Sequence, residues 1–177
     1  CYTLRNTGDL TKIPAFREGR FLVQDAAAKL TALAAGVLKG MKVMDLCAAP
    51  GGKSFAMAME MRDQGDIFAF DLHRSKIRLI QEGAERLGIH CIHAAAGNGK
   101  EFIPQYEVSA DVVLCDVPCS GLGIIRKKPD IPLKKEKELR GWPRVQLTIL
   151  TKAASYVTPG GTLVYDTCII LLTEHES

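Results

Sequence analysis

Two cysteines that directly follow apolar runs are the residues best suited to covalent chemistry. Cys119 lies in an Asp-Val-Pro-Cys-Ser-Gly segment after the run Val112–Cys115, and Cys168 follows the run Thr162–Tyr165. A cysteine thiolate is a strong nucleophile, and a nearby cation such as Lys53 favours that form. The alternative for each is a small buried hydrophobe, the ordinary role of a free cysteine. The proline and the Ser-Gly around Cys119 favour a shaped functional loop, whereas Cys168 alone would be interpreted as core.

A turn of small residues with two glycines follows the apolar run Met41–Met44 and leads into a helix-like pattern. The turn and the first helical residue are Cys47, Ala48, Ala49, Pro50, Gly51, Gly52 and Lys53. A strand, a tight turn and a helix in this order present backbone N–H groups to a nucleotide-like ligand. Glycine lets the main chain approach such a ligand closely. The spaced Gly-x-Gly-x-x-Gly fingerprint is missing, so a plain packing turn is the alternative.

Polar residues also follow the next two apolar runs. Asp71 lies about 20 residues beyond Gly51, where a carboxylate accepts both hydroxyl protons of a ribose. Its alternative role is an N-cap for the following helix, and both roles can coexist. Asn98 lies after the third run, where a contact to an adenine edge is expected. An Asn-Gly turn with Gly99 is the interpretation that the sequence alone favours.

Apolar runs alternate with helix-like patterns along the chain, which predicts an α/β fold with a mostly parallel, doubly wound sheet. The carboxyl ends of the fourth and fifth strands then lie side by side. Cys115, inside a run, is expected in the core, and a Pro-Gly-Gly turn is expected before the last strand. The expected strands are 42–46, 67–70, 90–93, 112–115 and 162–165, and the expected helices are 24–35, 53–62, 75–87 and 144–156.

The composition is that of one ordinary globular domain. The 177 residues are 47% hydrophobic and 24% charged, and no apolar run approaches the roughly 20 residues that cross a bilayer. Six cysteines without a Cys-x-x-Cys pair argue against a zinc ribbon and for reduced thiols in the cytoplasm. We expect no metal, no membrane association and a monomer. Residues 1–23 are interpreted as a lead-in segment and 24–177 as the main domain.

Positive charge is concentrated in one segment, although the net charge is only +3. The segment Arg126–Arg140 contains seven basic and three acidic residues. Such a basic surface beside a reactive edge suggests a polyanionic partner. A solvated loop and helix face explains the charge alone equally well.

Together these segments resemble the Sun/Fmu family of RNA cytosine-5 methyltransferases, which use S-adenosylmethionine. The likeness runs from Phe21 to the last residue. Its strongest feature is the pair of Pro-Cys and Thr-Cys, because DNA cytosine methyltransferases use the Pro-Cys cysteine as nucleophile and this RNA family the Thr-Cys one. The family-like blocks are Phe21–Asp25, Cys47–Lys53, Asp116–Gly123, Ile124–Asp130 and Gly160–Tyr165.

The resemblance implies a Rossmann-like class I methyltransferase fold and a role for each candidate residue. Cys168 attacks carbon 6 of a cytosine, Asp116 binds the base edge and supplies a proton at ring nitrogen 3, and Cys119 assists release of the adduct. Lys53 helps to hold the base. S-adenosylmethionine binds the residues Cys47, Ala48, Ala49, Pro50, Gly51, Gly52, Lys53, Asp71, Asn98 and Asp116. The implied substrate is an unpaired or flipped cytosine in ribosomal RNA, with transfer RNA as the rival, and the segment Arg126–Arg140 would contact phosphates.

The chain departs from the family pattern close to Cys168. Serine is usual where this chain has Asp166 and Ile169, aspartate where it has Asn98, and asparagine where it has His175. Strand alternation places residues 166 and 168 on one face, so Asp166 is expected to raise the pKa of the Cys168 thiol. The chain also stops where family members continue with further strands, so the fold is expected to lack its last strands.

Two other classes of function were weighed against the enzyme. A non-catalytic RNA-binding module that keeps the fold is favoured by Asp166, Ile169 and the early chain end, and opposed by the intact pair of Cys119 and Cys168. An NAD-dependent dehydrogenase lacks its glycine fingerprint and leaves both cysteine motifs unexplained.

Overall fold

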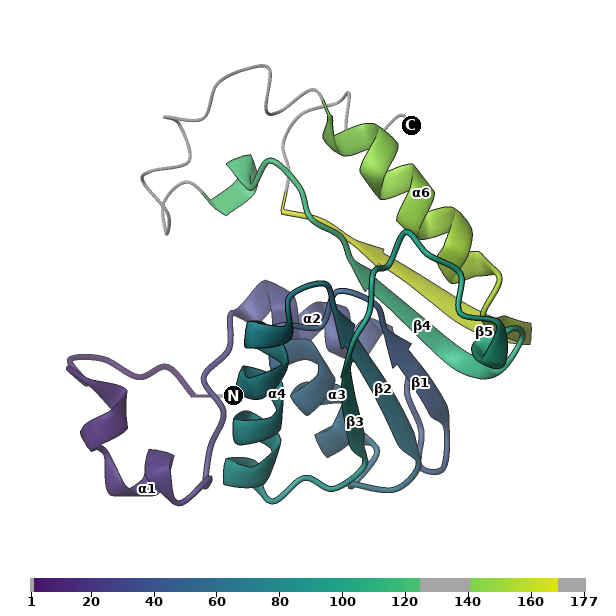
Figure 1. Cartoon of the computed structure of the whole chain (residues 1–177). Helices are drawn as coiled ribbons and strands as arrows, with labels where there is room; N and C mark the ends of the chain where they lie inside the picture. Colours follow the sequence, from purple (N-terminus) through teal and green to yellow (C-terminus); the bar gives the residue numbers. More distant parts are fainter. Residues whose placement is uncertain (1, 125–140, 169–177) are drawn as a thin grey trace.

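The computed structural model of the chain describes residues 2–124 and 141–168, which form a parallel five-stranded sheet between helices (Figure 1). The strand order is β3-β2-β1-β4-β5, so the chain winds outward in both directions from β1. This is the doubly wound α/β architecture that the alternating pattern predicts. The strands are β1 (Lys42–Asp45), β2 (Asp66–Asp71), β3 (Ile92–Ala96), β4 (Ala110–Asp116) and β5 (Val157–Asp166).

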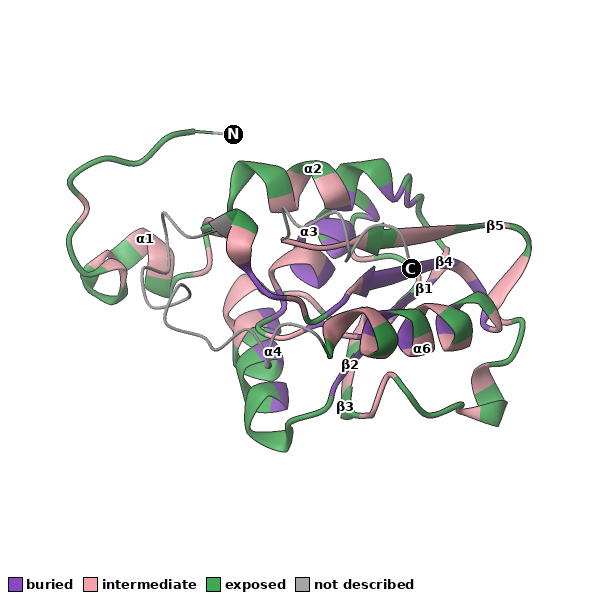
Figure 2. Cartoon of the chain, turned by 90° about the horizontal axis from the view of Figure 1, so that it is seen from above, coloured by how far each residue is buried: buried purple, intermediate pink, exposed green. Residues whose placement is uncertain are grey.

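The helices cover both faces of the sheet. Helices α2, α3 and α4 lie on one face and α6 on the other (Figures 1 and 2). Short turns of 3-10 helix, η1 (Leu10–Lys12), η2 (Pro104–Tyr106) and η3 (Leu122–Ile124), lie in the connections. The α-helices are α1 (Pro14–Arg17), α2 (Ala26–Ala34), α3 (Gly52–Glu60), α4 (Arg74–Leu87) and α6 (Trp142–Ala154).

Two apolar layers result from the alternation of side chains along each strand. Val43 and Ile67 pack with α2 and α3, whereas their neighbours Met44 and Phe68 pack on the α6 side. Cys115 is fully buried in the α6 layer, as the sequence predicts. Burial on both faces explains why the central strands are almost continuously apolar.

The third strand and the Pro-Gly-Gly segment differ from the sequence prediction. β3 begins at Ile92 rather than at residue 90, because Asp63 Oδ1 accepts the amides of His90 and Cys91 (2.8 Å each) and holds them in the preceding loop. Residues 159–161 lie inside β5 instead of before it. There the register against β4 jumps, so the strand accommodates the segment as a bulge.

The lead-in segment is anchored on the end of α4. Arg86 donates from Nη1 to the carbonyl of Phe16 (2.8 Å), and its guanidinium lies 4.0 Å from the centre of the Phe16 ring. Gly19 passes so close that an added Cβ would meet the Arg86 carbonyl oxygen at 1.7 Å. Within the described residues, no helix is both long and apolar enough to cross a membrane.

Candidate active site

A cavity of about 610 Å³ opens at the carboxyl ends of the strands, where a doubly wound sheet binds its ligands. One wall carries polar groups and cysteines, and the other is the apolar start of α6, with Trp142, Val145 and Ile149. Of the residues that the sequence predicts for the site, the wall holds Cys47, Ala49, Asp71, Asn98, Asp116, Cys119 and Cys168.

The glycine turn lies beside the cavity and contributes Cys47 and Ala49 to its lining. Gly51 has φ 105°, a conformation that favours glycine, and an added Cβ would meet the Phe55 ring at 2.4 Å. The amide of Ala48 donates to the carbonyl of Phe70 (2.8 Å), which ties the turn to β2. Helix α3 begins at Gly52 and directs its N-terminus towards the turn, as predicted. Ala48, Pro50, Gly51, Gly52 and Lys53 lie behind the cavity wall that the described residues form.

Asp71 connects the turn to the second strand and is only 6% exposed. Its carboxylate accepts the amide of Ala49 (3.3 Å) and that of His73 (3.0 Å), and Lys76 lies at 3.8 Å. The N-cap interpretation is wrong, because His73 occupies the N-cap of α4. The carboxylate instead lies on the cavity wall, as a ribose contact requires.

Asn98 forms the turn that the sequence alone favours. Its Oδ1 accepts the amide of Lys100 (3.2 Å), and its Nδ2 donates to Glu101 (2.8 Å). The residue also lines the cavity, where its proposed contact to an adenine edge remains a prediction.

A charged cluster, which we call the lysine centre, links α3 to the ends of β4 and β5. Lys53 Nζ lies 2.5 Å from Asp116 Oδ2 and 3.0 Å from Asp166 Oδ2, and the lysine side chain is only 12% exposed. Burial raises the pKa of Asp116, the ammonium of Lys53 opposes that shift, and the charge of Asp166 adds to it. Burial alone would lower the pKa of Lys53, but the two carboxylates outweigh it and raise that pKa. Lys53 is therefore a firmly charged, carboxylate-bound ammonium.

Asp45 is a buried acid beneath the lysine centre that the sequence reasoning did not assign. Its Oδ2 accepts the Ser54 hydroxyl (2.6 Å), and its Oδ1 has no hydrogen-bond partner among the described residues. Burial raises the pKa of Asp45 to about 7, although the Ser54 hydrogen bond opposes the shift. The signal that could have found it is an acidic residue at the end of a buried strand, directly before a glycine turn.

The two candidate cysteines lie on adjacent segments. The amide of Val117 donates to the carbonyl of Asp166 (3.1 Å) and that of Gly123 to the carbonyl of Cys168 (3.0 Å), which joins the loop of Cys119 to the end of β5. Burial raises the pKa of the Cys168 thiol, Asp116 and Cys119 raise it further, Lys53 opposes, and Asp166 adds a smaller increase. The predicted effect of Asp166 on Cys168 thus has the expected direction.

Gln146 of α6 is a second residue that the sequence reasoning missed. It is fully buried, and its Nε2 donates to the carbonyl of Pro118 (3.2 Å), next to Cys119. A buried glutamine in a helix that otherwise packs an apolar face was the available signal.

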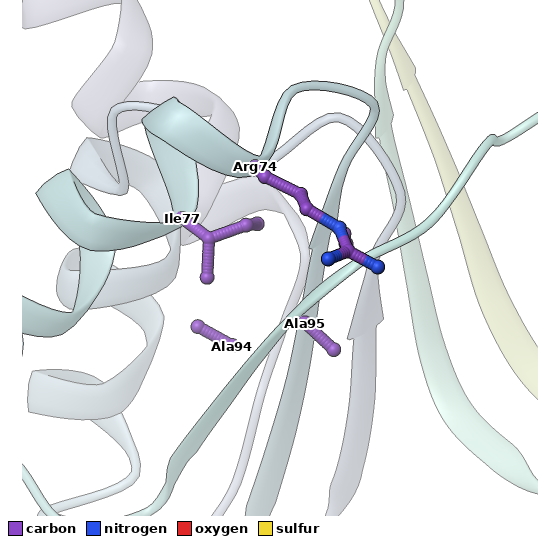
Figure 3. Close-up of a pocket in the computed structure, with 5 residues that line it drawn as sticks. Arg74, Ile77, Ala94 and Ala95 are labelled. Carbon is purple, nitrogen blue, oxygen red and sulfur yellow. The ribbon is translucent and has the colours of Figure 1, made fainter.

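A second hollow, of about 360 Å³, lies between α4 and β3. Figure 3 shows Arg74 and Ile77 of α4 above Ala94 and Ala95 of β3. It contains none of the predicted site residues. The predicted basic segment Arg126–Arg140, with Ile169 and His175, falls outside the described residues.

A parallel sheet with a glycine turn after β1, an acid at the end of β2 and a cavity at the carboxyl edge is typical of Rossmann-like proteins that bind nucleotide-type cofactors, a class that includes the S-adenosylmethionine-dependent methyltransferases. Residues 34–177 match the family of the 16S rRNA methyltransferase RsmB/F, so the chain belongs to this family. The Sun/Fmu resemblance is thereby confirmed.

The relatives and structural neighbours agree with this assignment. The probable ribosomal RNA small subunit methyltransferase B of Bacillus subtilis is 40% identical over 163 residues, which are 91% of this chain and 36% of the relative. The corresponding protein of Salmonella agona is 35% identical over 93% of this chain and 38% of its own length. The chain thus spans less than two fifths of the curated relatives it matches.

Solved structures show the same fold. NSun6 from Pyrococcus horikoshii, solved with the S-adenosylmethionine analogue SFG, matches with a TM-score of 0.85 and 28% identity over 94% of this chain and 42% of that one. A methyltransferase homologue from the same organism gives a TM-score of 0.82 and 30% identity over 96% of this chain and 53% of that one.

The cavity suits the cofactor of this family, S-adenosylmethionine. Asp71 places a nearly buried carboxylate on the wall, which it shares with Cys47 and Ala49 of the glycine turn. Trp142, Val145 and Ile149 of α6 add apolar surface to the lining of the same cavity of about 610 Å³. A nucleoside with one polar ribose edge and one flat apolar face fits such walls.

Proposed function

We propose that this chain transfers a methyl group from S-adenosylmethionine to carbon 5 of a cytosine in RNA, most simply ribosomal RNA. The observation that carries the proposal is that Cys119 and Cys168, from the ends of neighbouring strands, line one cavity together with Asp116. Asp116 is in turn held by the buried ammonium of Lys53. The names of the curated relatives support ribosomal RNA as the substrate.

The cofactor would lie along the glycine turn. Asp71 would bind its ribose hydroxyls, Asn98 its adenine edge, and the residues from Cys47 to Gly52 would form the surface beneath it. When bound, it supplies an electrophilic methyl group. Lys53 forms ion pairs with Asp116 and Asp166 and does not line the cavity. We therefore propose that it holds Asp116 in place rather than contacting the base.

The covalent steps use groups of the chain itself. The Cys168 thiolate forms a bond to carbon 6 of the cytosine, while Asp116 gives a proton to ring nitrogen 3, so that electron density moves to carbon 5. After the methyl group has been added at carbon 5, a base would take the carbon-5 proton, the bond between carbon 6 and sulfur would break to release the Cys168 thiolate, and ring nitrogen 3 would return its proton to Asp116. Cys119 lies on the adjoining loop, where it would assist this release. The raised pKa of Cys168 means that its thiol must lose a proton before attack.

The RNA must present the cytosine outside a stack, because the cavity accepts only a flipped or unpaired base. The basic segment Arg126–Arg140 would contact phosphates and make binding depend on salt concentration. We further propose that the protein acts as a cytoplasmic monomer, in keeping with the thiols of Cys47, Cys91, Cys115 and Cys168, which form no disulfide.

Trapping of a protein–RNA adduct tests this function. The Cys119→Ala variant, mixed with unmethylated ribosomal RNA and S-adenosylmethionine, is expected to give a slowly migrating band on a denaturing gel, because release of the adduct is impaired. The Cys119→Ala, Cys168→Ala double variant is the matched control and should give no band. A band that persists in the double variant would contradict the assignment of Cys168.

The same experiment separates the enzyme from a non-catalytic RNA-binding module. A sample that binds the cofactor and RNA but never forms an adduct with ribosomal or transfer RNA would support the binding module. The carboxylate of Asp166 near Cys168 is the feature that favours this alternative.

A further inference from the structure

Asp166 brings a second carboxylate to a single ammonium. It lies opposite Asp116 in the register of β4 and β5, and both Oδ2 atoms reach Lys53 Nζ, at 3.0 Å and 2.5 Å. If all three groups are charged, the cluster carries one uncompensated negative charge in a largely buried place. Coulomb repulsion then favours a proton on one of the carboxylates.

Contacts besides that with Lys53 fix Asp166 in this position, one of them to the same Oδ2 atom. Thr31 of α2 donates its hydroxyl to Asp166 Oδ2 (3.1 Å), and the same hydroxyl lies 3.2 Å from the carbonyl of Ala27. The Asp166 carbonyl accepts the amide of Val117 at 3.1 Å. The side chain is 24% exposed, against 34% for Asp116. Asp166 is therefore the anchored partner, and Asp116 is the one that faces the cavity.

We propose that Asp166 is a positioning residue that competes with Asp116 for the positive charge of the Lys53 ammonium. Asp116 therefore keeps the proton that it delivers to the cytosine ring. This inference rests on the proposed function. The charged and titratable groups around Asp116 are Lys53 of α3, Asp45 and Cys47 at the end of β1, Asp166 and Cys168 at the end of β5, and Cys119 of its own loop. Among them, Asp166 contacts the same ammonium as Asp116, which makes it the direct competitor.

Asp166 acts on the nucleophile in the same direction. Its negative charge raises the pKa of both Asp116 and Cys168. Adduct formation needs a protonated Asp116 and a deprotonated Cys168. The rate therefore falls at high pH, where Asp116 loses its proton, and at low pH, where Cys168 is protonated. Asp166 therefore moves both limbs of the pH–rate profile towards higher pH.

The variants Asp166→Asn and Asp166→Ser remove the charge, and Asp166→Asn keeps an oxygen that can accept from Thr31. The 177-residue chain is labelled with carbon-13 aspartate, and the NMR signal of the Asp116 carboxyl carbon is assigned with the Asp116→Asn variant. In both Asp166 variants this carbon is expected to titrate about one pH unit lower than in the parent chain. Alkylation of Cys168 by iodoacetamide, followed by peptide mass spectrometry without RNA or cofactor, should also shift to lower pH. Thr31→Val is the matched control, because it removes the hydrogen bond but keeps the carboxylate, and should leave both midpoints within a few tenths of a unit.

Adduct formation in the Cys119→Ala background links these titrations to the reaction. Both limbs of its pH profile should move to lower pH when Asp166→Asn or Asp166→Ser is added. Unshifted titrations, or an adduct whose limbs do not move, would overturn this inference and leave the proposed function standing. A shifted titration with no adduct in any variant would overturn the proposed function and, with it, the catalytic meaning of Asp166.

Discussion

The two ends of the parallel sheet use the same residue type in opposite ways. At the amino ends of the strands, Asp63 accepts the amides of His90 and Cys91, and Asp111 accepts the amide of Lys42 (2.8 Å). Burial alone would raise the pKa of Asp63, but these hydrogen bonds and one with the His90 ring outweigh it and lower the pKa to about 2. Each of these carboxylates joins the start of a strand to a neighbouring segment.

At the carboxyl ends, Asp45, Asp116 and Asp166 form a group of neighbouring acids around Lys53, whereas Asp71 accepts the amides of Ala49 and His73. Asp45 is fully buried with a pKa of about 7, and the pKa of Asp116 is raised by burial and by Asp166 despite the contact with Lys53. With a pKa of about 7, Asp45 exchanges its proton close to neutral pH. The comparison teaches that a carboxylate bound by backbone amides stabilises the fold, while a carboxylate buried among other acids is held ready for chemistry.

Removal of the shared ammonium should have the largest effect. Lys53→Met leaves the carboxylates of Asp116 and Asp166 in a low-polarity site without a counter-charge, so we expect a loss of about 2–3 kcal/mol in the free energy of unfolding at pH 7. The loss should be smaller at pH 5, where the carboxylates take up protons, and methyl transfer should fall by about 100-fold or more. Urea denaturation at the two pH values and a methyl-transfer assay measure these changes.

Lys29→Met is the matched control for this experiment. Lys29 also contacts one carboxylate oxygen, Glu60 Oε1 at 2.6 Å, but its partner is 42% exposed. An exposed pair contributes about 1 kcal/mol or less, with little dependence on pH in this range. Equal losses in the two variants would show that the lysine centre is an ordinary surface ion pair.

The sequence predicted much of the fold because its signals are local. The alternation of apolar runs and helical patterns indicated the parallel sheet, the neighbouring positions of β4 and β5 and a helix start at Lys53, one residue from the observed start of α3 at Gly52. Features of the fold that depend on tertiary contacts, such as the start of β3, could not be predicted in this way. The amides of His90 and Cys91 belong to a loop because Asp63 binds them from 27 and 28 residues away, and no local pattern contains that information.

The site was predicted in part for the same reason. Cys119, Cys168 and Asp116 could be placed together because each follows a strand of one parallel sheet. That Lys53 is shared between two carboxylates depends on how the ends of α3 and β5 approach each other, which neither segment specifies alone. Asp45 was overlooked although its position directly before the glycine turn was a signal, because the burial and the contact with Ser54 that give this signal its meaning are tertiary features.

The charge of Asp45 provides the next test of the comparison. Its pKa in the folded chain, about 7, exceeds the ordinary value of 3.8 for an exposed aspartate, so its charge costs stability increasingly as pH rises from about 4 to about 7. Asp45→Asn, which mimics the protonated acid, should therefore gain about 2 kcal/mol in the free energy of unfolding relative to the parent chain between pH 5 and pH 8. Urea denaturation at both pH values measures the difference.

Ser54→Ala sharpens this prediction. The Ser54 hydroxyl lowers the pKa of Asp45, so its removal should raise that pKa further and extend the loss of stability to higher pH. A difference between Asp45→Asn and the parent chain that is constant from pH 5 to pH 8 would show that Asp45 is charged throughout.

Asp63 should give the opposite pH dependence and the smallest effect. Its pKa of about 2 lies below the unfolded value of 3.8, so its contribution is complete above about pH 4 and disappears as pH falls towards 2. Asp63→Asn keeps an oxygen that can accept the amides of His90 and Cys91 but removes the charge. Because the Asp63 side chain is 30% exposed, we expect a loss of only about 1 kcal/mol at pH 6, which shrinks at pH 3. Urea denaturation at these two pH values is the measurement, and a loss that grows on acidification would contradict the assignment.

The stability differences of Asp45→Asn and Asp63→Asn from the parent chain should therefore change with pH in opposite directions. This result is required, because one type of side chain then reports two different environments at the two ends of one sheet.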